Sequence, residues 1–322
     1  ILCMPDHIFI AKKILEITKK EVDFLFSKLD ADKKLKGKKK IFVKPNLFAP
    51  EGSQTGATVD FDLISYVVDY LNERDKKVYL GEVGAHQYDS EKLFKDLGVY
   101  DRFNAEFINL NFTEFEEVLF RIKGVEYTFK IPKIVLKCDG VINIPKYKTH
   151  AATILSLAMK NLYGLLPGNE KWKGHALGLN ETICNINELI PSDMVITDGY
   201  VAMEGLGPTL GVPVQKNVLF GADSAVAHDV AVSQMLHVDL PLLKHKNMNV
   251  DIKLYNEKGE RTEDIDFSLR LPPKLYSWFW YHVNEYFYKC GPFLEEKGIP
   301  PGKVLNLLVN DKTIKFWRSL QG

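Results

Sequence analysis

A short apolar run that stops at a proline sets the strongest limit on the fold of this chain. Val141–Ile144 has the length and composition of a buried β-strand, and Pro145 ends it because proline cannot donate to a strand ladder. Residues two apart point the same way in an extended segment. One side of the next segment therefore carries three basic side chains, Lys146, Lys148 and His150. A helix is expected from Thr149, a fair N-cap followed by helix-forming residues.

Similar apolar runs alternate with helical patterns along the chain, which predicts an α/β fold. The sheet is expected to be mixed but largely parallel and Rossmann-like, with helices on both faces. A β-hairpin across Lys123-Gly124 supplies antiparallel pairing. The other predicted strands are Ile41–Val43, Val78–Val83, Phe107–Leu110, Met194–Thr197 and Val218–Phe220.

Three regions are expected from changes in pattern. Residues 1–39 predict an N-terminal helical segment packed on the core, and residues 40–250 an α/β core domain that carries the site. Residues 251–322 predict a small α+β extension that ends in a hairpin of Leu305–Val309 with Thr313–Phe316. Its tract 276–288 is densely aromatic, a pattern typical of core packing or of a homodimer interface.

Composition excludes several classes of function. Lys and Arg number 42, as do Asp and Glu, so a neutral chain of 322 residues has no global field to attract nucleic acid. No apolar run has transmembrane length. The four widely separated cysteines argue against an iron–sulfur cluster or a disulfide framework and suit a reducing cytoplasm.

Polar residues follow four of the predicted strands. If the strands are parallel, these residues meet at one sheet edge, where α/β proteins bind ligands. Lys146, Lys148, His150 and His175 are the candidate catalytic residues, with His175 placed on a loop over Leu165–Gly178 that could close over the site. The candidate substrate-binding residues are Lys44, Asn46, Asn143, Lys160, Asn161 and Gly207. Lys160 and Asn161 face either this cleft or solvent.

The carboxylates Asp198, Asp223 and Glu204 have two readings. They hold a divalent metal, or they pair with the lysines as a structural network; no tight histidine spacing supports the metal. A further carboxylate, Asp229, lies among apolar residues of a predicted helix and needs a partner, because an unpaired buried charge is costly.

Several of these motifs together resemble the family catalogued as domain of unknown function 362. They are Val43–Asn46, Asn143–His150, Met159–Gly164, Thr197–Gly199, Gly205–Pro208 and Asp223–Asp229, in the family's order, and the likeness covers roughly residues 40–240. The activity of that family is unsettled. Many of its members resemble carriers of ferredoxin-type clusters, whose cysteines this chain lacks. The family is also distantly similar to nickel-pincer lactate racemases, an analogy at the level of the fold.

These observations lead to two hypotheses. The first is a cytoplasmic enzyme that binds a small anion, a carboxylate or a phosphate ester, in a cleft lined by Lys, His and Asn. The second is a non-catalytic accessory protein that binds a cofactor or metal and acts with a redox or protein partner. The sequence favours the first because its cations gather at strand ends in a neutral chain.

Overall fold

A computed structural model describes residues 7–48, 50, 52–85, 89–208, 210–243, 248–283, 290 and 311–319 of the chain. Its centre is a twisted sheet in the order β12-β1-β11-β10-β7-β2-β3-β4, with β8 and β9 attached beside β10. The strands of this sheet are β1 His7–Lys13, β2 Lys40–Pro45, β3 Lys77–Glu82, β4 Glu106–Asn109, β7 Gly140–Ile144, β8 Lys146–His150, β9 Ile154–Ser156, β10 Met194–Glu204, β11 Val212–Ala222 and β12 Val250–Tyr255.

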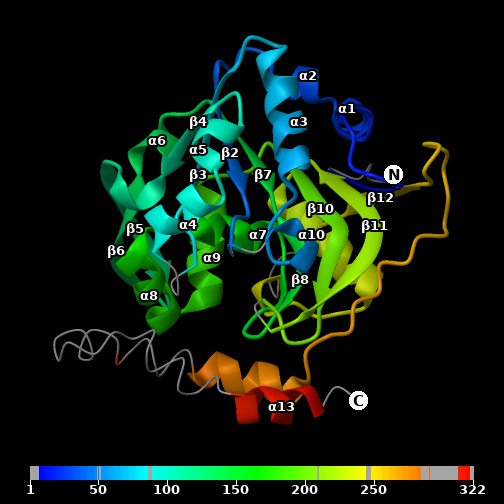
Figure 1. Ribbon diagram of the computed structural model, residues 1–322. Coiled ribbons are helices and arrows are strands. Elements are labelled where there is room, and N and C mark those ends of the chain that lie inside the picture. The colour runs from blue at the N-terminus through cyan, green and yellow to red at the C-terminus, as the bar shows by residue number, and fades with distance from the viewer. Residues whose placement is uncertain are drawn as a thin grey trace, which may run out of the picture.

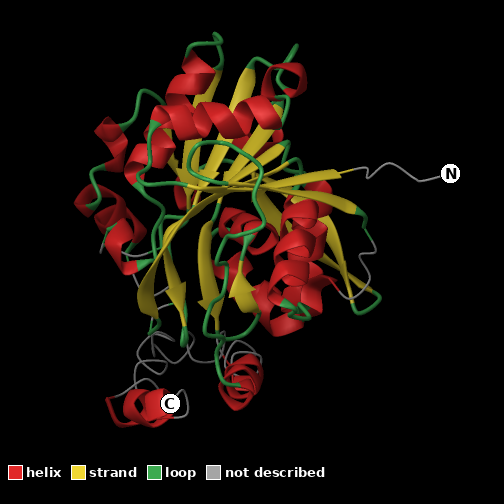
Figure 2. Cartoon of the chain, turned by 90° about the vertical axis from the view of Figure 1, so that its right-hand side faces the viewer, coloured by secondary structure: helices red, strands yellow, loops and turns green. Residues whose placement is uncertain are grey.

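Helices cover both faces of the sheet (Figure 2). The helices are α1 Lys19–Lys28, α2 Ala31–Lys34, α3 Phe61–Asn72, α4 Ser90–Asp96, α5 Val99–Arg102, α6 Lys133–Leu136, α7 Ala158–Asn161, α8 Gly168–Leu177, α9 Leu179–Leu189, α10 Ala225–Leu236 and α13 Asp311–Ser319, with 3₁₀ turns at Ser53–Thr55, Leu110–Phe112, Leu162–Leu165 and Pro241–Leu243. The expectation of a mixed, largely parallel α/β sheet is confirmed, since β7, β2, β3 and β4 run parallel and β11 runs antiparallel to β10.

Two hydrophobic cores follow from the alternation of side chains along each strand. Ile41 and Val43 of β2 pack under α1 and α3, whereas Phe42 between them packs on the side of α9 and α10. Successive side chains of a strand point to opposite faces, so one strand supplies both cores. The predicted hairpin is present as β5 Phe115–Ile122 and β6 Val125–Pro132, and β5 packs against α9.

The N-terminal segment differs from the expected helix. His7–Lys13 is a sheet strand whose Phe9 and Ile10 enter different cores, and only residues beyond it form α1. A strand buried on both faces reads as a continuous apolar run, which short windows do not distinguish from a helix. The sheet also includes β12, parallel to β1, so it extends past residue 250.

The helix expected from Thr149 is also absent. Residues Lys146–His150 form β8, which pairs with β10 and with β9, and the helix begins only at Ala158. Helix propensity is a weak prior that strand pairing overrides here. In contrast, the loop expected over Leu165–Gly178 is largely the helix α8, which begins after Pro167 at a position where proline is tolerated.

The C-terminal region contains helices at the bottom of the view in Figure 1. Residues 274–283 are helical and bury Tyr276 and Trp280 against Trp317 of α13 and Leu206. The strand expected at Thr313–Phe316 is therefore wrong, because these residues are in α13. Its expected partner, Leu305–Val309, and residues 284–288 of the aromatic tract lie outside the described residues.

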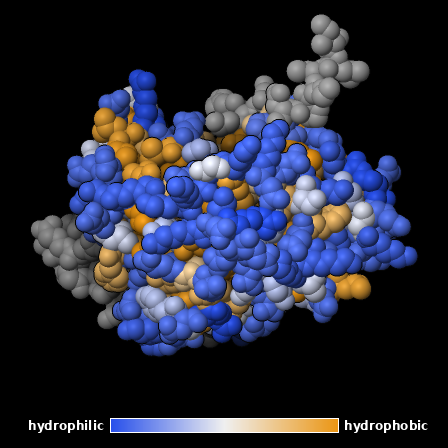
Figure 3. Space-filling model, turned by 90° about the horizontal axis from the view of Figure 1, so that it is seen from above, coloured by the Kyte–Doolittle hydropathy of each residue, from blue (hydrophilic) through white to orange (hydrophobic). Residues whose placement is uncertain are grey.

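The surface shows no dominant apolar face in the view from above, where hydrophilic side chains cover most of the area and hydrophobic ones form smaller patches (Figure 3). No helix in the described part of the chain combines the length and the apolar character needed to cross a membrane.

Candidate functional site

Lys44 ends β2 as a fully buried cation. Its Nζ lies 2.5 Å from Glu82 Oε2 and donates to the Pro45 carbonyl at 2.8 Å. Burial lowers the pKa of Lys44, and the charge of Glu82 opposes that effect. Gly164 is packed against this pair, since a Cβ there would meet Glu82 Oε1 at 2.8 Å. Lys44 is therefore held in place by its neighbours.

Three asparagines connect β2, β7 and α7. Asn161 Nδ2 donates to Asn143 Oδ1 at 2.8 Å and to the Lys44 carbonyl at 3.0 Å, while its Oδ1 accepts from Asn46 Nδ2 at 2.9 Å. Asn143 Nδ2 donates to the Ala158 carbonyl at 2.8 Å. Asn143 and Asn161 are buried, so the network fixes α7 against the strand ends.

Lys146 and Asp198 form a buried ion pair whose atoms are 2.6 Å apart. Asp198 also accepts from the backbone N–H groups of Asp60 and Tyr200, at 2.8 and 3.0 Å. A buried charge pair persists only when such additional hydrogen bonds satisfy it. This pair joins β8, β10 and the start of α3, and both of its side chains are excluded from solvent.

Lys148 is buried but has no carboxylate partner in the described chain. Its Nζ donates to Asn46 Oδ1 at 2.9 Å and to the Ala57 carbonyl at 2.6 Å, and lies 4.4 Å from the centre of the Phe48 ring. Burial lowers the pKa of Lys148 well below its usual value, and repulsion from Lys160 adds to the decrease. An anion that approached this amine would oppose the decrease and favour its protonated form.

His150 ends β8 and is partly exposed. Backbone N–H groups of Ala152 and Thr153 donate to its Nδ1 at 3.0 and 3.4 Å. Burial, with repulsion from Lys160, lowers the pKa of His150 well below its usual value, so the ring is neutral near pH 7. Because Nδ1 accepts hydrogen bonds, the proton of the neutral ring lies on Nε2. His150 therefore presents a donor.

Lys160 lies in α7, near the centre of the view in Figure 1. It is partly exposed, and burial of its amine lowers its pKa to about 8. His175 lies in the last turn of α8, where its ring meets Tyr163 edge-on at 5.3 Å between centroids. Charge on His175 acts on the pKa of His150, which places these rings near one another. A helix, not a loop, carries His175.

Lys171 joins these groups, although the sequence did not single it out. Its buried Nζ donates to the Gly84 carbonyl at 2.7 Å, and burial lowers its pKa to about 7. The charges of Glu82, Lys44 and Lys160 act on it. The amphipathic pattern of α8 is weak, so its sequence predicts a solvent-facing lysine at this position. Only the packing of α8 shows that Lys171 is buried. We call Lys148, Lys160, Lys171, His150 and His175 the lysine–histidine cluster.

The carboxylates predicted to bind a metal have separate surroundings. Asp223 lies 3.1 Å from Nδ1 of His7, and Glu204 lies 3.5 Å from Arg270. The antiparallel direction of β11 places Asp223 beside the start of β10, at the opposite sheet edge from the cluster. Across the residues that the structure describes, no three His, Cys, Asp or Glu side chains gather as a metal site would require.

Gly207 contacts the backbone of β8 and the residue that follows it. Its N–H donates to Thr149 Oγ1 at 3.3 Å, and its carbonyl accepts from the Ala151 N–H at 2.9 Å. A Cβ on Gly207 would overlap the Thr149 carbonyl oxygen. The structure thus gives Gly207 the role of a close backbone contact that supports β8.

Asp229 has the partners that its burial requires. Its two oxygens accept from the backbone N–H groups of Ala158 and Met159, at 2.9 and 3.0 Å, at the start of α7. His228 Nδ1 lies 2.9 Å from Asp229, and His228 Nε2 lies 2.8 Å from Thr197 Oγ1. All three side chains are buried. The carboxylate thereby fixes the short helix that carries Lys160 and Asn161.

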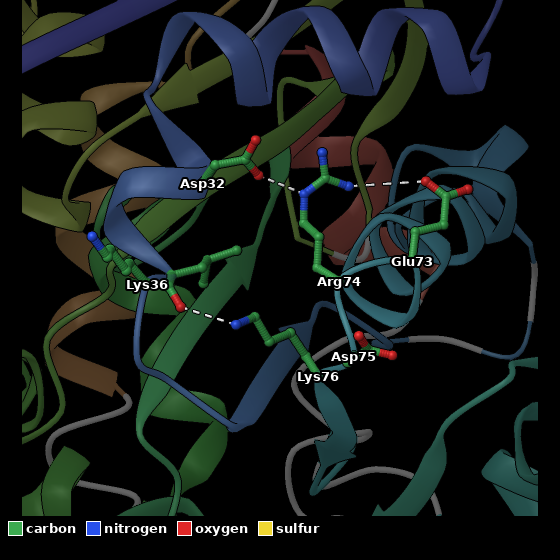
Figure 4. A pocket seen from close by; sticks show the side chains of 7 residues that line it. Asp32, Lys36, Glu73, Arg74, Asp75 and Lys76 are labelled. Atoms are coloured by element: carbon green, nitrogen blue, oxygen red, sulfur yellow. Dashed lines mark hydrogen bonds and ion pairs between the residues drawn. The ribbon is translucent and has the colours of Figure 1, made fainter.

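A surface hollow of about 560 Å³ lies elsewhere, between the end of α2 and the end of α3. Its side chains already pair, as the dashed lines in Figure 4 show. Arg74 lies 2.5 Å from Asp32 and 3.9 Å from Glu73. Lys76 donates to the Leu35 carbonyl at 3.0 Å. Because its charges compensate one another, this hollow is a weaker ligand-site candidate than the lysine–histidine cluster.

Comparisons with known proteins place this geometry in a family. The profile of the family described as Domain of unknown function (DUF362) matches residues 41–234, more than half of the chain. The chain belongs to the DUF362 family. All members of the lysine–histidine cluster fall inside the matched segment.

Two known proteins are similar to this DUF362 chain. A thylakoid-associated protein of Synechocystis sp. is 24% identical over 207 residues, which cover 62% of this chain and 64% of that protein, less than two thirds of its length. The lactate racemase apoprotein of Thermoanaerobacterium thermosaccharolyticum superposes with a TM-score of 0.44 and 12% identity, over 70% of this chain and 57% of that one.

Proposed function

We propose that this DUF362 protein binds a small anion, a carboxylate or a phosphate ester, at the lysine–histidine cluster. The observation that carries the proposal is the imbalance of charge. One carboxylate, Glu82, raises the pKa values of three lysines, Lys44, Lys148 and Lys171. Glu82 is already paired with Lys44. An anion that entered here would compensate the remaining lysines and raise their pKa values again.

The residues of the cluster would have different roles in binding the anion, which follow from their burial and hydrogen bonds. Lys160 is partly exposed and its charge acts on the buried Lys148, so these two amines would meet the anion first. His150 would donate its Nε2–H to an anionic oxygen, because its Nδ1 is already engaged. His175 would move a proton, a contribution of about 10²–10⁴-fold in rate if the protein is an enzyme.

The other predicted site residues would support this arrangement. Asn46, Asn143 and Asn161 hold α7 against the strand ends, and Lys44 belongs to the same hydrogen-bonded layer. Lys146 would act through β8, which its ion pair with Asp198 anchors. In this proposal Lys44 and Lys146 position the cluster, and they are not the anion's first contacts.

A thermal-shift screen tests the proposal. Small carboxylates, sugar phosphates and nucleotides are added to the wild type, to Lys148→Met, to Lys160→Met and to the control Lys95→Met, which alters an exposed lysine of α4. At least one anion should raise the melting temperature of the wild type and the control, and raise it less in the two cluster variants. Equal shifts in all four proteins, or no shift in the wild type, would overturn the proposal.

A further inference from the structure

Lys160 differs from the other lysines of the site in having no hydrogen-bond acceptor among the residues that the structure describes. Lys44 and Lys146 each have a carboxylate, and Lys148 and Lys171 each have a backbone carbonyl. Within that part of the chain, the contact recorded for Lys160 Nζ is the face of Tyr163, 5.5 Å from the ring centre. Within the described residues, its amine therefore has no hydrogen bond to break when it meets a ligand.

The position of Lys160 is also fixed from behind. Asp229 binds the first N–H groups of α7, and Asn161, the next residue along, is held by Asn143 and Asn46. The residue is intermediate in exposure, so Lys160 is less enclosed than Lys148 and Lys171, which are buried. A fixed backbone and a desolvated amine without a hydrogen-bond acceptor in the described chain are what a nucleophilic lysine requires.

The electrostatic surroundings favour the neutral, nucleophilic amine. With a pKa of about 8, about a tenth of Lys160 side chains are neutral at pH 7, far more than for an ordinary lysine. Lys148 and Lys171 lie close enough for the charge of Lys160 to lower their pKa values, so a carboxylate that entered here would favour the protonated form of both. The cluster thus combines a nucleophile with an anion-binding side.

We propose that Lys160 forms an imine with a 2-oxo acid, whose carboxylate is held by the neighbouring cations while its carbonyl carbon meets the amine. This inference rests on the proposed anion site and names its substrate class. A 2-oxo acid is the small anion that places an electrophilic carbon directly beside a carboxylate, matching an amine that lies among cations.

The step conserves atoms and electrons. The lone pair of Lys160 Nζ attacks the carbonyl carbon, forming the C–N bond while the C=O π pair moves to oxygen. A proton passes from nitrogen to that oxygen, giving a carbinolamine. Protonation of the hydroxyl and loss of water then leave the C=N bond. His150 Nε2–H can hydrogen-bond the oxygen, and His175 can move the proton.

Reductive trapping tests the inference on the full chain. Pyruvate and, separately, glyoxylate are incubated with the protein and sodium cyanoborohydride, which delivers hydride to the imine carbon and leaves a stable secondary amine. Peptide mass spectrometry then locates the adduct. The expected result is modification of Lys160 ahead of the highly exposed Lys92, and more of it as the pH rises through about 8.

Two variants and one matched ligand make the outcomes separable. Lys160→Arg keeps a positive charge but has no primary amine, and it should lose the adduct, whereas Lys92→Arg should keep it; circular dichroism checks that both fold. Propionate, which lacks the carbonyl, reports anion binding in the wild type by thermal shift. A propionate shift without an adduct on Lys160 overturns the imine and leaves the anion site standing. Absence of both the shift and the adduct overturns both proposals.

Discussion

Several lysines of this protein have buried amines, where a positive charge has a large desolvation cost, and Lys171 is the clearest case. Its pKa is about 7 in the folded protein and 10.5 when exposed, so between these values the unfolded chain binds more protons. The contribution of Lys171 to the free energy of unfolding therefore rises with pH across that window, by up to about 1.4 kcal/mol per pH unit for one proton. Below pH 7 the cost of the buried charge is fully present.

The first prediction follows from that sign. Lys171→Met removes the titrating group, so the rise in unfolding free energy between pH 7 and 10.5 should be smaller than in the wild type. Urea denaturation at several pH values measures it. Lys95→Met, in which an exposed lysine is replaced, should keep the wild-type slope. Identical slopes in all three proteins would show that Lys171 titrates alike in both states.

The second prediction concerns the pH dependence of anion binding. An anion favours the protonated lysines, so affinity should be greatest below pH 7 and should fall as Lys171 and then Lys160 lose their protons, near pH 7 and 8. Isothermal titration with a carboxylate identified in the thermal-shift screen measures this, and it should show proton uptake on binding. An affinity that stays constant from pH 6 to 9 would contradict the prediction.

At the level of elements, the helix α7 depends on one carboxylate from α10. Asp229→Asn removes the charge that the N–H groups of Ala158 and Met159 point toward, and it places an amide N–H against one of them. A loss of about 1–3 kcal/mol in unfolding free energy is expected. Chemical denaturation measures it, with the exposed Asp239→Asn as the control. A loss no larger than that of the control would mean that α7 does not need this cap.

The contact between Gly207 and β8 leads to a fourth prediction. Gly207→Ala forces a Cβ against the Thr149 carbonyl, so β8 must shift, at a cost of about 1–3 kcal/mol. Gly168→Ala, at the start of α8, meets nothing within 4 Å and should be neutral or slightly stabilising. Thermal melts compare the two variants. Equal melting temperatures would refute a close contact at Gly207.

At the level of the whole molecule, the homodimer expected from the aromatic tract stays a prediction. Tyr276 and Trp280 are buried, whereas Leu275 and Trp278 on the same helical segment are 56% and 61% exposed. If this face joins two copies, light scattering should show a mass that increases with concentration, and Trp278→Arg should abolish that increase. A monomer at all concentrations in both proteins would instead leave the aromatic residues with core packing alone.

The sheet and the candidate site were predictable to different extents. Val141–Ile144, Ile41–Val43 and the hairpin of β5 and β6 were read correctly because each depends on neighbours in sequence. Lys148, His150 and Lys160 were named because basic residues in a conspicuous motif need no knowledge of the fold. Lys171 was missed, since its burial depends on how α8 packs.

The sequence by itself determined the strand segments, the proline that separates β7 from β8, and the presence of basic groups without matching acids beside them. Only the tertiary structure decided which lysine is paired and which is not. Asp198 neutralises Lys146 from 52 positions away along the chain, while Lys160 has no such partner in the described residues. Likewise, because β11 runs antiparallel to β10, Asp223 lies beside the start of β10 and away from the strand ends that carry the cluster. The reason is physical: local propensity and pattern act over a few residues, whereas pairing, burial and strand direction depend on contacts between segments that chain order alone does not bring together.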